Sequence, residues 1–376
     1  MRILINFATL KKGGGQNVGL NFINGLNINK YPEIEFFFAA CKDTQIEKSL
    51  IEKGYHNIIS LPPSPVKRIF KEKTFVSKYI KQKHIDVVYT CFGYSFINKS
   101  ICQICGVADS NLLFPEIDFW EGYTGIKKLK KHLIDSYRKY GYKRANGLIF
   151  ENAAMQLKSK EIFGKNCNSV FIKPSFSLPR PSDNEKISLP TATGLKCLFL
   201  CGWQRNKGIL KIPEIISEAQ KRNIVLDSYI SVDVDEKNSL CSEFLKKAKG
   251  MMDHIHLIGS VKKTQINYLY NNIDYVFLLS KLESFSNNII EAWFYKKPLI
   301  VSDEDWSRAI CNKAALYVDR NDANAIVDSL VKTIQNGSFS ELVNNGVKEF
   351  ETYPTIDEKI DEELKYVQKI WKMVQV

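Results

Sequence analysis

Short, continuous apolar runs alternate with longer amphipathic stretches along this chain, and this alternation limits the fold more than any other feature. The runs are RILINF, IEFFFAA, NIISL, DVVYT, NLLF, GLIFE and VFI in the first half, and KCLFLCG, LDSYISV, IHLIGSV, YVFLLS, PLIVSD and ALYVD in the second. Unbroken apolar runs are typical of parallel strands buried on both faces, and the stretches between them are typical of crossover helices. The pattern therefore predicts an α/β protein with doubly wound parallel sheets.

The length of the chain and one proline-rich stretch predict two domains. A chain of 376 residues exceeds the usual span of one hydrophobic core. The stretch KPSFSLPRPSDNEKISLPTATG has the composition of a linker. We predict a first domain over residues 1–175, a linker over 176–195 and a second domain over 196–355. Residues 356–376 space apolar side chains at helical intervals, so we expect a helix that packs back on the first domain.

Composition indicates the class of partner and the compartment. The net charge of +12 and the pI of about 9.1 indicate an anionic partner, which could be nucleic acid, an acidic membrane surface or a phosphorylated substrate. No apolar run reaches the roughly 18 residues of a membrane span, and the N-terminus lacks the apolar core of a secretory signal. The nine cysteines, including the CxxC pair Cys102 and Cys105, resemble buried free thiols of a reducing compartment. We therefore expect a cytoplasmic protein.

Residues 126–144 are the most basic stretch with a helical pattern. Ile126, Leu129, Leu133, Tyr137 and Tyr140 recur at helical spacing, and lysines and arginines surround them. Two arrangements fit this pattern. The apolar stripe could face a core while its basic back is solvated, or the helix could lie against anionic lipid on the inner membrane face.

Polar and glycine residues follow several predicted strands, where α/β sheets bind ligands. Gly13–Gly15 open a predicted helix after the first strand, so bare amides could meet an anion there, although a plain turn also fits. Arg205 and Lys207 follow the first strand of the second half and suit a diphosphate, with a solvated basic loop as the alternative.

A pair of carboxylates brackets the start of another predicted helix. Glu283 precedes a polar turn in which Ser284 or Ser286 is the predicted N-cap, and Glu291 lies two turns into the helix. Carboxylates accept hydrogen bonds from paired sugar hydroxyls, and free helix amides suit phosphate oxygens. His254 and His256 alternate along a predicted strand and indicate no metal site. The two Asp-x-Asp triplets, 233–235 and 303–305, are as frequent as chance predicts.

The stretch ESFSNNIIE resembles the E-x7-E motif of retaining GT-B glycosyltransferases, especially glycosyltransferase family four. GWQRNKG, IHLIGSV, YVFLLSKLESFSNNIIEAWFYKKPLIVSD and ALYVD follow in the order of that family, which is also called glycosyl transferases group 1. The resemblance is strong from about residue 197 to 327. It implies two Rossmann-like domains that face each other across a cleft, with the donor nucleotide sugar bound by the second.

The resemblance also implies roles for individual residues on the donor side. Arg205 and Lys207 would neutralise the donor diphosphate, Glu283 would hold hydroxyls of the transferred sugar, and Glu291 would take the ribose hydroxyls. Three residues would line the phosphates: Ser286, Asn287 and Asn288. No metal and no cofactor other than the nucleotide sugar is expected, because fixed cations and amides would stabilise the leaving group.

The remaining implied residues lie elsewhere in the chain. Gly14 and Gly15 would supply amides from the first domain, and the backbone near His256 to Ile258 would face the nucleobase. Glu116 and Asp118 stand where the family has a histidine, so they either act on the acceptor hydroxyl or belong to a capped loop. The sequence departs from the family pattern at two further places. Arg205 and Lys207 are more closely spaced than the family's Arg and Lys, and KPSFS replaces the family's NG-x-D before the linker.

The resemblance implies a retaining, metal-independent transferase that moves a hexose-type sugar from a UDP- or GDP-sugar to a hydroxyl of a glycan or lipid-linked acceptor. Bacterial surface polysaccharide or lipopolysaccharide assembly is the expected setting. The alternatives are a GT-B sugar-nucleotide epimerase or phosphorylase, and an inactive nucleotide-sugar-binding subunit. A nucleic-acid binder would rest on charge alone, so no nucleic-acid partner is expected.

Overall fold

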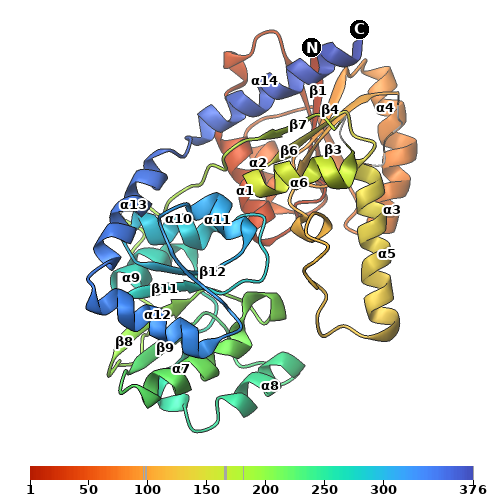
Figure 1. The fold of residues 1–376 in the computed structure, drawn as a ribbon. Helices are drawn as coiled ribbons and strands as arrows, with labels where there is room; N and C mark the ends of the chain where they lie inside the picture. The colour runs from red at the N-terminus through yellow and green to blue at the C-terminus, as the bar shows by residue number, and fades with distance from the viewer. Residues whose placement is uncertain (96, 98–99, 165–166, 181, 376) are drawn as a thin grey trace. The chain divides into compact units, whose positions relative to one another are not determined.

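The computed structural model describes residues 1–95, 97, 100–164, 167–180 and 182–375, and its chain divides into two compact units. Unit 1 consists of Met1–Pro115, Tyr123–Ser177 and Pro354–Val376, and unit 2 consists of Glu116–Gly122 and Leu178–Tyr353. Each unit is built around one parallel sheet (Figure 1). The α/β fold class predicted from the apolar runs is confirmed.

The sheet of unit 1 has the strand order β3-β2-β1-β4-β5-β6-β7, and all of its pairs are parallel. The strands are β1 (Arg2–Asn6), β2 (Glu35–Cys41), β3 (Ile58–Leu61), β4 (Val87–Thr90), β5 (Cys102–Val107), β6 (Gly147–Phe150) and β7 (Ser169–Phe171). Ile3 and Ile5 of β1 belong to one buried cluster and Leu4 to another. Both faces of the sheet are therefore covered, which explains why these strands show no polar alternation.

The helices that cover this sheet follow its strands in the sequence. They are α1 (Gly13–Gly25), α2 (Gln45–Glu52), α3 (Pro65–Lys71), α4 (Ser77–Gln82), α5 (Gly125–Tyr142), α6 (Ala153–Phe163) and α14 (Ile356–Gln375). Short turns are η1 (Ile28–Lys30), η3 (Ser110–Leu112) and the π-helical η2 (Glu72–Val76), which joins α3 to α4. The expected strand NLLF is wrong, because residues 110–112 form η3 and the strand is β5, the run that holds Cys102 and Cys105. Both thiols are buried and free.

Helix α14 belongs to unit 1 and packs on its core through Ile360, Leu364, Val367 and Ile370, all buried. Lys359 of the same helix is buried beside two carboxylates. Its ammonium lies 2.5 Å from Glu151 and 3.5 Å from Glu363. Burial lowers the pKa of Lys359, but the two carboxylates outweigh burial and raise the pKa above its ordinary value. The helix is thus fixed by an apolar stripe and by a charged cluster within it.

The sheet of unit 2 has the order β10-β9-β8-β11-β12-β13 and is also parallel throughout. The strands are β8 (Leu195–Phe199), β9 (Leu226–Ile230), β10 (Ile255–Leu257), β11 (Tyr275–Leu278), β12 (Leu299–Ser302) and β13 (Leu316–Val318). The helices are α7 (Ile212–Lys221), α8 (Ser239–Lys247), α9 (Ile266–Asn271), α10 (Asn287–Phe294), α11 (Asp305–Cys311), α12 (Ala323–Gln335) and α13 (Phe339–Glu351). Short turns are η4 (Arg205–Lys207), η5 (Ile209–Lys211), η6 (Met252–His254) and η7 (Lys263–Gln265).

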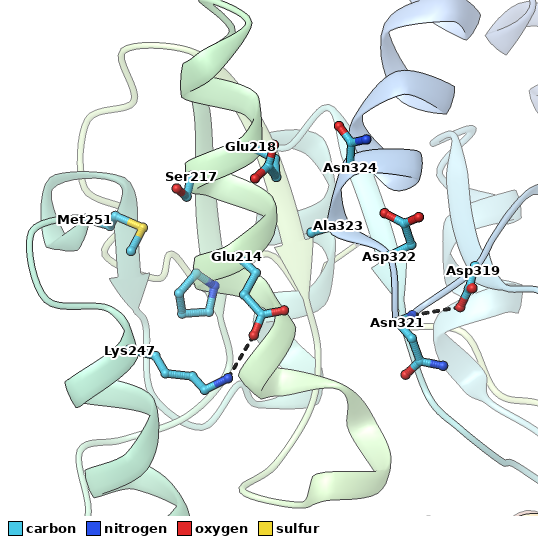
Figure 2. Close-up of a pocket in the computed structure, with 11 residues that line it drawn as sticks. Glu214, Ser217, Glu218, Lys247, Met251, Asp319, Asn321, Asp322, Ala323 and Asn324 are labelled. Carbon is cyan, nitrogen blue, oxygen red and sulfur yellow. Dashed lines mark hydrogen bonds and ion pairs between the residues drawn. The ribbon is translucent and has the colours of Figure 1, made fainter.

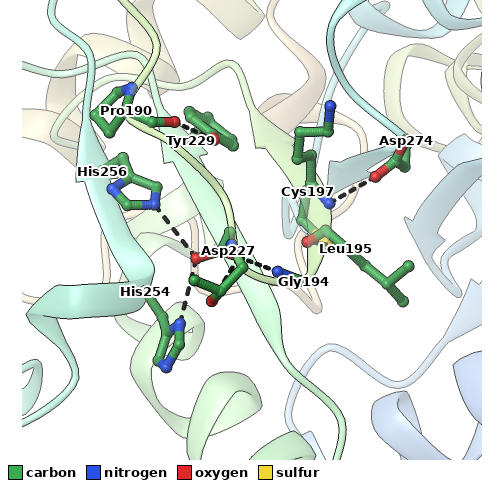
Figure 3. Close-up of polar contacts among 11 residues, drawn as sticks. Pro190, Gly194, Leu195, Cys197, Asp227, Tyr229, His254, His256 and Asp274 are labelled. Atoms are coloured by element: carbon green, nitrogen blue, oxygen red, sulfur yellow. Dashed lines mark hydrogen bonds and ion pairs between the residues drawn. The ribbon is translucent and has the colours of Figure 1, made fainter.

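Asp227 gathers donors at the amino end of this sheet (Figure 3). It is buried and accepts hydrogen bonds from the backbone N–H groups of Thr193 and Gly194 at 2.8 and 2.7 Å. His254 and His256 lie 3.2 and 3.4 Å from its other oxygen. Burial raises the pKa of Asp227, but these partners outweigh it and hold the pKa below its ordinary value. The two histidines therefore belong to the framework of unit 2, as their alternation on a strand indicated.

Candidate functional site

The carboxyl ends of β8 and β11 form the centre of the candidate site in unit 2. In the strand order, β9 and β10 lie on one side of β8, and the chain then returns to form β11 on the other side of β8. Ligands of open α/β sheets bind at such a topological switch point. The loop after β8 carries Arg205 and Lys207, and the loop after β11 carries Glu283.

Asn206 fastens these two loops to each other. Its side-chain amide donates to the carbonyl of Leu282 at 2.8 Å, and its amide oxygen accepts from the N–H of Leu282 at 3.1 Å. The N–H of Lys281 donates to the carbonyl of Asn206 at 2.7 Å. At Gly208, where φ is +71°, an added Cβ would lie 2.5 Å from the carbonyl of Leu279, so glycine is required for this approach. The backbone thus fixes the positions from which Lys207 and Glu283 extend.

The structure brings Lys207 together with Glu283 but directs Arg205 elsewhere. The Lys207 ammonium forms an ion pair with the Glu283 carboxylate, and these side chains are 23% and 13% exposed. Arg205 pairs instead with Glu243 of α8, and its side chain lies against Gly122. Of the two cations predicted for the diphosphate, Lys207 is therefore the one that shares the site with Glu283.

Helix α10 presents its amino end to the same edge of the sheet. Ser286 occupies the N-cap position but makes no side-chain capping hydrogen bond, and the first turn holds no acidic residue. Asn287 is exposed. Asn288 donates to the carbonyl of Leu200 at 2.9 Å, which fastens α10 to the end of β8. The start of α10 thus carries the amide groups and the partial positive charge that favour an anion.

Glu291 lies on α10 beside the Tyr270 ring. The Tyr270 hydroxyl donates to the Glu291 carboxylate at 3.0 Å, and Tyr270 stacks on Tyr295 with ring centroids 4.9 Å apart. Burial raises the pKa of Glu291 to about 7, although the Tyr270 hydrogen bond acts in the opposite direction. This carboxylate therefore titrates near neutral pH, which is uncommon for a glutamate and typical of functional sites.

The other predicted positions are distributed over both units. Ile258 directly follows β10 and donates its N–H to the carbonyl of Ile230 at 2.9 Å. Gly14 and Gly15 lie in the first turn of α1 in unit 1, where an added Cβ on Gly14 would meet nothing within 4 Å. Glu116 and Asp118 are exposed and belong to unit 2. The backbone carbonyl of Asp118 lies 3.5 Å from the Lys281 ammonium, which forms an ion pair with Glu121.

Unit 1 has a cavity of about 520 Å³ at its own switch point, between β1 and β4. Leu10 and Phe92, which follow these strands, line it together with Arg68 of α3 and Arg138 of α5. Arg138 lies 3.2 Å from Asp109, and Arg68 lies 3.8 Å from the buried Glu72. Among the described residues, the Arg68 Nε is buried without a hydrogen-bond partner. The cavity therefore combines apolar walls with two guanidinium groups, Lys11 and the carboxylate of Asp109, which pairs with Arg138.

A second cavity, of about 660 Å³, lies on the surface of unit 2 between α7 and the start of α12 (Figure 2). Glu214, Glu218, Asp319 and Asp322 line it, and Lys247 is bound 2.8 Å from Glu214. The nearby cations Lys211, Lys247, Lys221 and Arg222 are already paired with Glu214 and Glu218, and Asp319 and Asp322 add negative charge that repels phosphate groups. The larger cavity is therefore a poor fit for a nucleotide, in contrast to the edge that holds Lys207.

The described part of the chain lacks a membrane-spanning helix and a metal-binding cluster. Among these residues, no helix combines the length and the apolar composition needed to cross a bilayer. No group of three or more His, Cys, Asp or Glu side chains is placed to hold a metal ion there. The Asp-x-Asp triplets have other contacts: Asp233 accepts from Ser260 at 3.2 Å, and Asp303 forms an ion pair with Arg308.

Sequence patterns did not reveal several residues that build the site. Asn206 and Tyr270 act through single long-range contacts with Leu282 and Glu291, and no local spacing indicates such contacts. Glu243, the partner of Arg205, is one of many surface glutamates in the sequence. The one available signal was the position of Asn206 between the two predicted cations.

Comparison with known protein families gives a match within unit 2. Residues 204–350 match the family model described as Glycosyl transferases group 1. This range includes Lys207, Glu283, Glu291 and all of α10. Unit 2 therefore contains a glycosyl transferases group 1 domain. The group 1 domain expected from ESFSNNIIE and the accompanying motifs is thus confirmed.

Solved structures extend the likeness to the whole fold. Sucrose-phosphate synthase from Thermosynechococcus elongatus has a TM-score of 0.70 at 13% identity, covering 99% of this chain and 100% of that one. A glycosyltransferase from Rickettsia africae has a TM-score of 0.67 at 13% identity, covering 99% and 98%. Anabaena HepE in complex with UDP has a TM-score of 0.67 at 15% identity, covering 97% and 100%. No curated protein sequence matches the chain. These likenesses confirm the predicted GT-B fold.

Proposed function

We propose that this protein is a retaining glycosyltransferase that moves a hexose-type sugar from a UDP- or GDP-sugar to a hydroxyl of a glycan or lipid-linked acceptor, without a metal ion. The observation that carries the proposal is the Lys207–Glu283 pair, held at the switch point of a group 1 domain beside the start of α10. The Anabaena HepE structures with UDP and with UDP-glucose support a uridine nucleotide as the first donor to test.

The geometry fits a reaction in which charge develops on a leaving diphosphate. The bond between the sugar C1 and the donor phosphate oxygen breaks, and a bond from the acceptor oxygen to C1 forms on the same face. The acceptor proton passes to the departing phosphate oxygen. Lys207 and the amides of α10, at Ser286, Asn287 and Asn288, stabilise the developing negative charge. Glu283 then holds sugar hydroxyls near the positively charged C1 of the oxocarbenium-like state.

The other positions complete the proposed site. Glu291 receives the ribose hydroxyls and the backbone at Ile258 adjoins the base, as the family pattern implies. We assign the amides of Gly14 and Gly15 to phosphate binding, Arg205 to a peripheral cation, and Glu116 or Asp118 to the acceptor hydroxyl. The proposed setting is surface polysaccharide or lipopolysaccharide assembly, which rests on the family resemblance.

A thermal-shift panel of UDP, GDP, ADP, CMP and dTDP tests the donor site directly. We expect one nucleotide to raise the melting temperature of wild type and to lose that effect in Glu291→Ala. Glu236→Ala is the matched control, because Glu236 is an exposed carboxylate of the same unit. A ligand at about 100 times its Kd adds about 2.7 kcal/mol to the free energy of unfolding. If no nucleotide shifts the wild type, the donor-site assignment is wrong.

The stereochemistry and the class of reaction need a second experiment. With the donor identified, NMR of the product shows whether the anomeric configuration is kept, and an unchanged rate in EDTA supports a metal-independent reaction. Product that forms without any acceptor would replace the transferase by an epimerase. Specific nucleotide binding without turnover for any acceptor tried would favour a binding subunit.

A further inference from the structure

The helices that flank the unit 1 cavity carry apolar side chains on their outer surfaces. In α3 and η2, Val66 is 77%, Phe70 69% and Phe75 49% exposed. On α5 the exposed apolar residues are Ile126, Leu129, Leu133, Ile134, Tyr137 and Tyr140, and Ile126 is 84% exposed. We name this set the α3–α5 surface. The stripe on α5 therefore points away from the core of unit 1, so the core-facing arrangement is wrong.

The α3–α5 surface is continuous with the cavity. Ile134 and Tyr137 of α5 line the cavity, and so do Pro65 and Ile69 of α3. Figure 1 shows both helices in unit 1. Soluble monomers rarely expose contiguous apolar patches of this kind unless the patch binds something.

Charge decides what kind of partner this surface suits. Residues 65–76 and 125–144 are described throughout, and their cations are Lys67, Arg68, Lys71, Lys73, Lys127, Lys128, Lys130, Lys131, Arg138, Lys139, Lys143 and Arg144. Their carboxylates are Glu72 and Asp135, which are buried and lie 3.8 Å from Arg68 and 3.6 Å from Arg138. These two segments therefore present apolar groups and cations outward, with no exposed carboxylate between them.

We propose that the α3–α5 surface docks on an anionic lipid bilayer and brings the mouth of the unit 1 cavity to the membrane. Exposed Leu, Ile and Phe side chains enter the boundary between headgroups and acyl chains, and the surrounding lysines contact anionic headgroups. A second protein chain would need carboxylates to match the cations and an apolar patch of its own, whereas an anionic bilayer supplies both features over any area.

The docking surface has a consequence for the acceptor. A cavity at the membrane surface with the guanidinium groups of Arg68 and Arg138 suits an acceptor that is linked to lipid through phosphate. This step rests on the proposed function, whereas membrane docking does not. Vesicle binding requires neither donor nor acceptor, so its failure is distinguishable from a failure of the transferase proposal.

Sedimentation with vesicles tests the proposal on the full chain. We expect binding to vesicles of phosphatidylcholine with about 30 mol% phosphatidylglycerol, little binding to phosphatidylcholine alone, and at least about tenfold weaker binding in about 0.5 M NaCl. The double variant Leu129→Ser with Leu133→Ser should bind at least about tenfold more weakly. Its control is Ile51→Ser with Leu157→Ser, because those residues of α2 and α6 are 62% and 66% exposed, close to the 59% and 62% of the α5 pair.

A charge series completes the test. The triple variant Lys67→Gln, Lys127→Gln, Lys130→Gln should weaken binding at least about tenfold. The triple variant Lys365→Gln, Lys369→Gln, Lys372→Gln on α14 removes the same charge and should change binding less than about twofold. Absence of binding to phosphatidylglycerol vesicles at low salt would overturn the proposal. The proposal would also be overturned if a control variant, apolar or charged, lost as much vesicle binding as the variant that it is matched with. The proposal would also be overturned if the wild type formed a dimer that does not bind vesicles, and if the double variant Leu129→Ser with Leu133→Ser were monomeric.

Discussion

Lys207 and Glu283 form an ion pair, and this pairing has a cost for donor binding. Both side chains are mostly buried, so their attraction is stronger than that of a surface pair. A diphosphate that recruits the Lys207 ammonium must compete with Glu283. Hydrogen bonds that Glu283 then accepts from sugar hydroxyls offset the loss of its ion pair with Lys207. In the proposed reaction, the pair therefore links diphosphate binding to sugar binding.

Substitution of each partner should separate these two contributions. We expect Glu283→Gln to lower kcat at least about a hundredfold, while its affinity for the free nucleoside diphosphate is unchanged or higher because Lys207 is released. Lys207→Met should weaken nucleoside diphosphate binding and lower kcat together. Isothermal titration and initial rates measure both. Glu243→Gln, which removes the partner of Arg205, is the control. Full turnover in Glu283→Gln would refute the assigned role of Glu283.

Glu291 should make the protein sensitive to pH near neutrality. Its pKa of about 7 in the folded chain exceeds the ordinary value of 4.5, so its stabilising contribution is complete below about pH 4.5 and is lost as pH rises through about 7. Without ligand, Glu291→Gln should therefore unfold at higher temperature than wild type at about pH 8, and this difference should shrink toward about pH 5.

Donor affinity should have the opposite pH dependence, because the ionised carboxylate is the better acceptor for ribose hydroxyls. A nucleotide sugar is the suitable probe, since its diphosphate is a diester and does not titrate in this range. We expect its affinity to rise between about pH 6 and about pH 8 in wild type and to stay flat in Glu291→Gln. A flat profile in both proteins would show that Glu291 does not bind the donor.

At the scale of the element, local sequence patterns predicted the positions of most strands and of the last helix. Continuous apolar runs located twelve of the thirteen strands among the described residues, and the spacing of Ile360, Leu364, Val367 and Ile370 located α14. The strand β5 was missed because Gln103 and Gly106 interrupt its run and the more apolar NLLF follows. Asn111 and Ser110 favour a turn at that place.

Contacts between elements are the part that local patterns could not supply. The pairing of β8 with β11 places Lys207 beside Glu283, although 76 residues separate them in sequence. The stripe on α5 fitted two arrangements, since spacing defines a face but not what the face meets. The exposed fractions of Ile126 and Leu129 exclude the core-facing arrangement.

The charged cluster under α14 gives a prediction at the scale of the element. Lys359→Met leaves Glu151 buried without its cation, so we expect the free energy of unfolding of unit 1 to fall by about 3–5 kcal/mol. Chemical denaturation measures this loss. The double variant Lys359→Met with Glu151→Gln should recover part of it, because it neutralises one of the two buried carboxylates that lose their cation, Glu151 and Glu363. A Lys359→Met protein as stable as wild type would show that the cluster does not fix α14.

At the scale of the whole molecule, the chain consists of two units with separate cores. The buried clusters around β1 belong to unit 1 and the cluster around β8 belongs to unit 2. The proposed donor residues Lys207, Glu283 and Glu291 all lie in unit 2, whereas the cavity with Arg68 and the proposed membrane surface lie in unit 1. Ligands of the two kinds should therefore stabilise different parts of the chain.

Calorimetry should resolve this division. Lys359→Met should lower the unfolding transition of unit 1, and Asp227→Asn, which removes the charge that His254, His256 and two backbone N–H groups share, should lower that of unit 2 by about 1–3 kcal/mol. Because the pKa of Asp227 is held low, the effect of Asp227→Asn should be present near neutral pH and fade as pH falls below the ordinary range of an aspartate. The donor nucleotide should raise mainly the transition that Asp227→Asn lowers, because Lys207, Glu283 and Glu291 lie in unit 2 and only the amides of Gly14 and Gly15 come from unit 1. A nucleotide that raised only the transition sensitive to Lys359→Met would place the donor site in unit 1 and overturn the assignment to Lys207, Glu283 and Glu291.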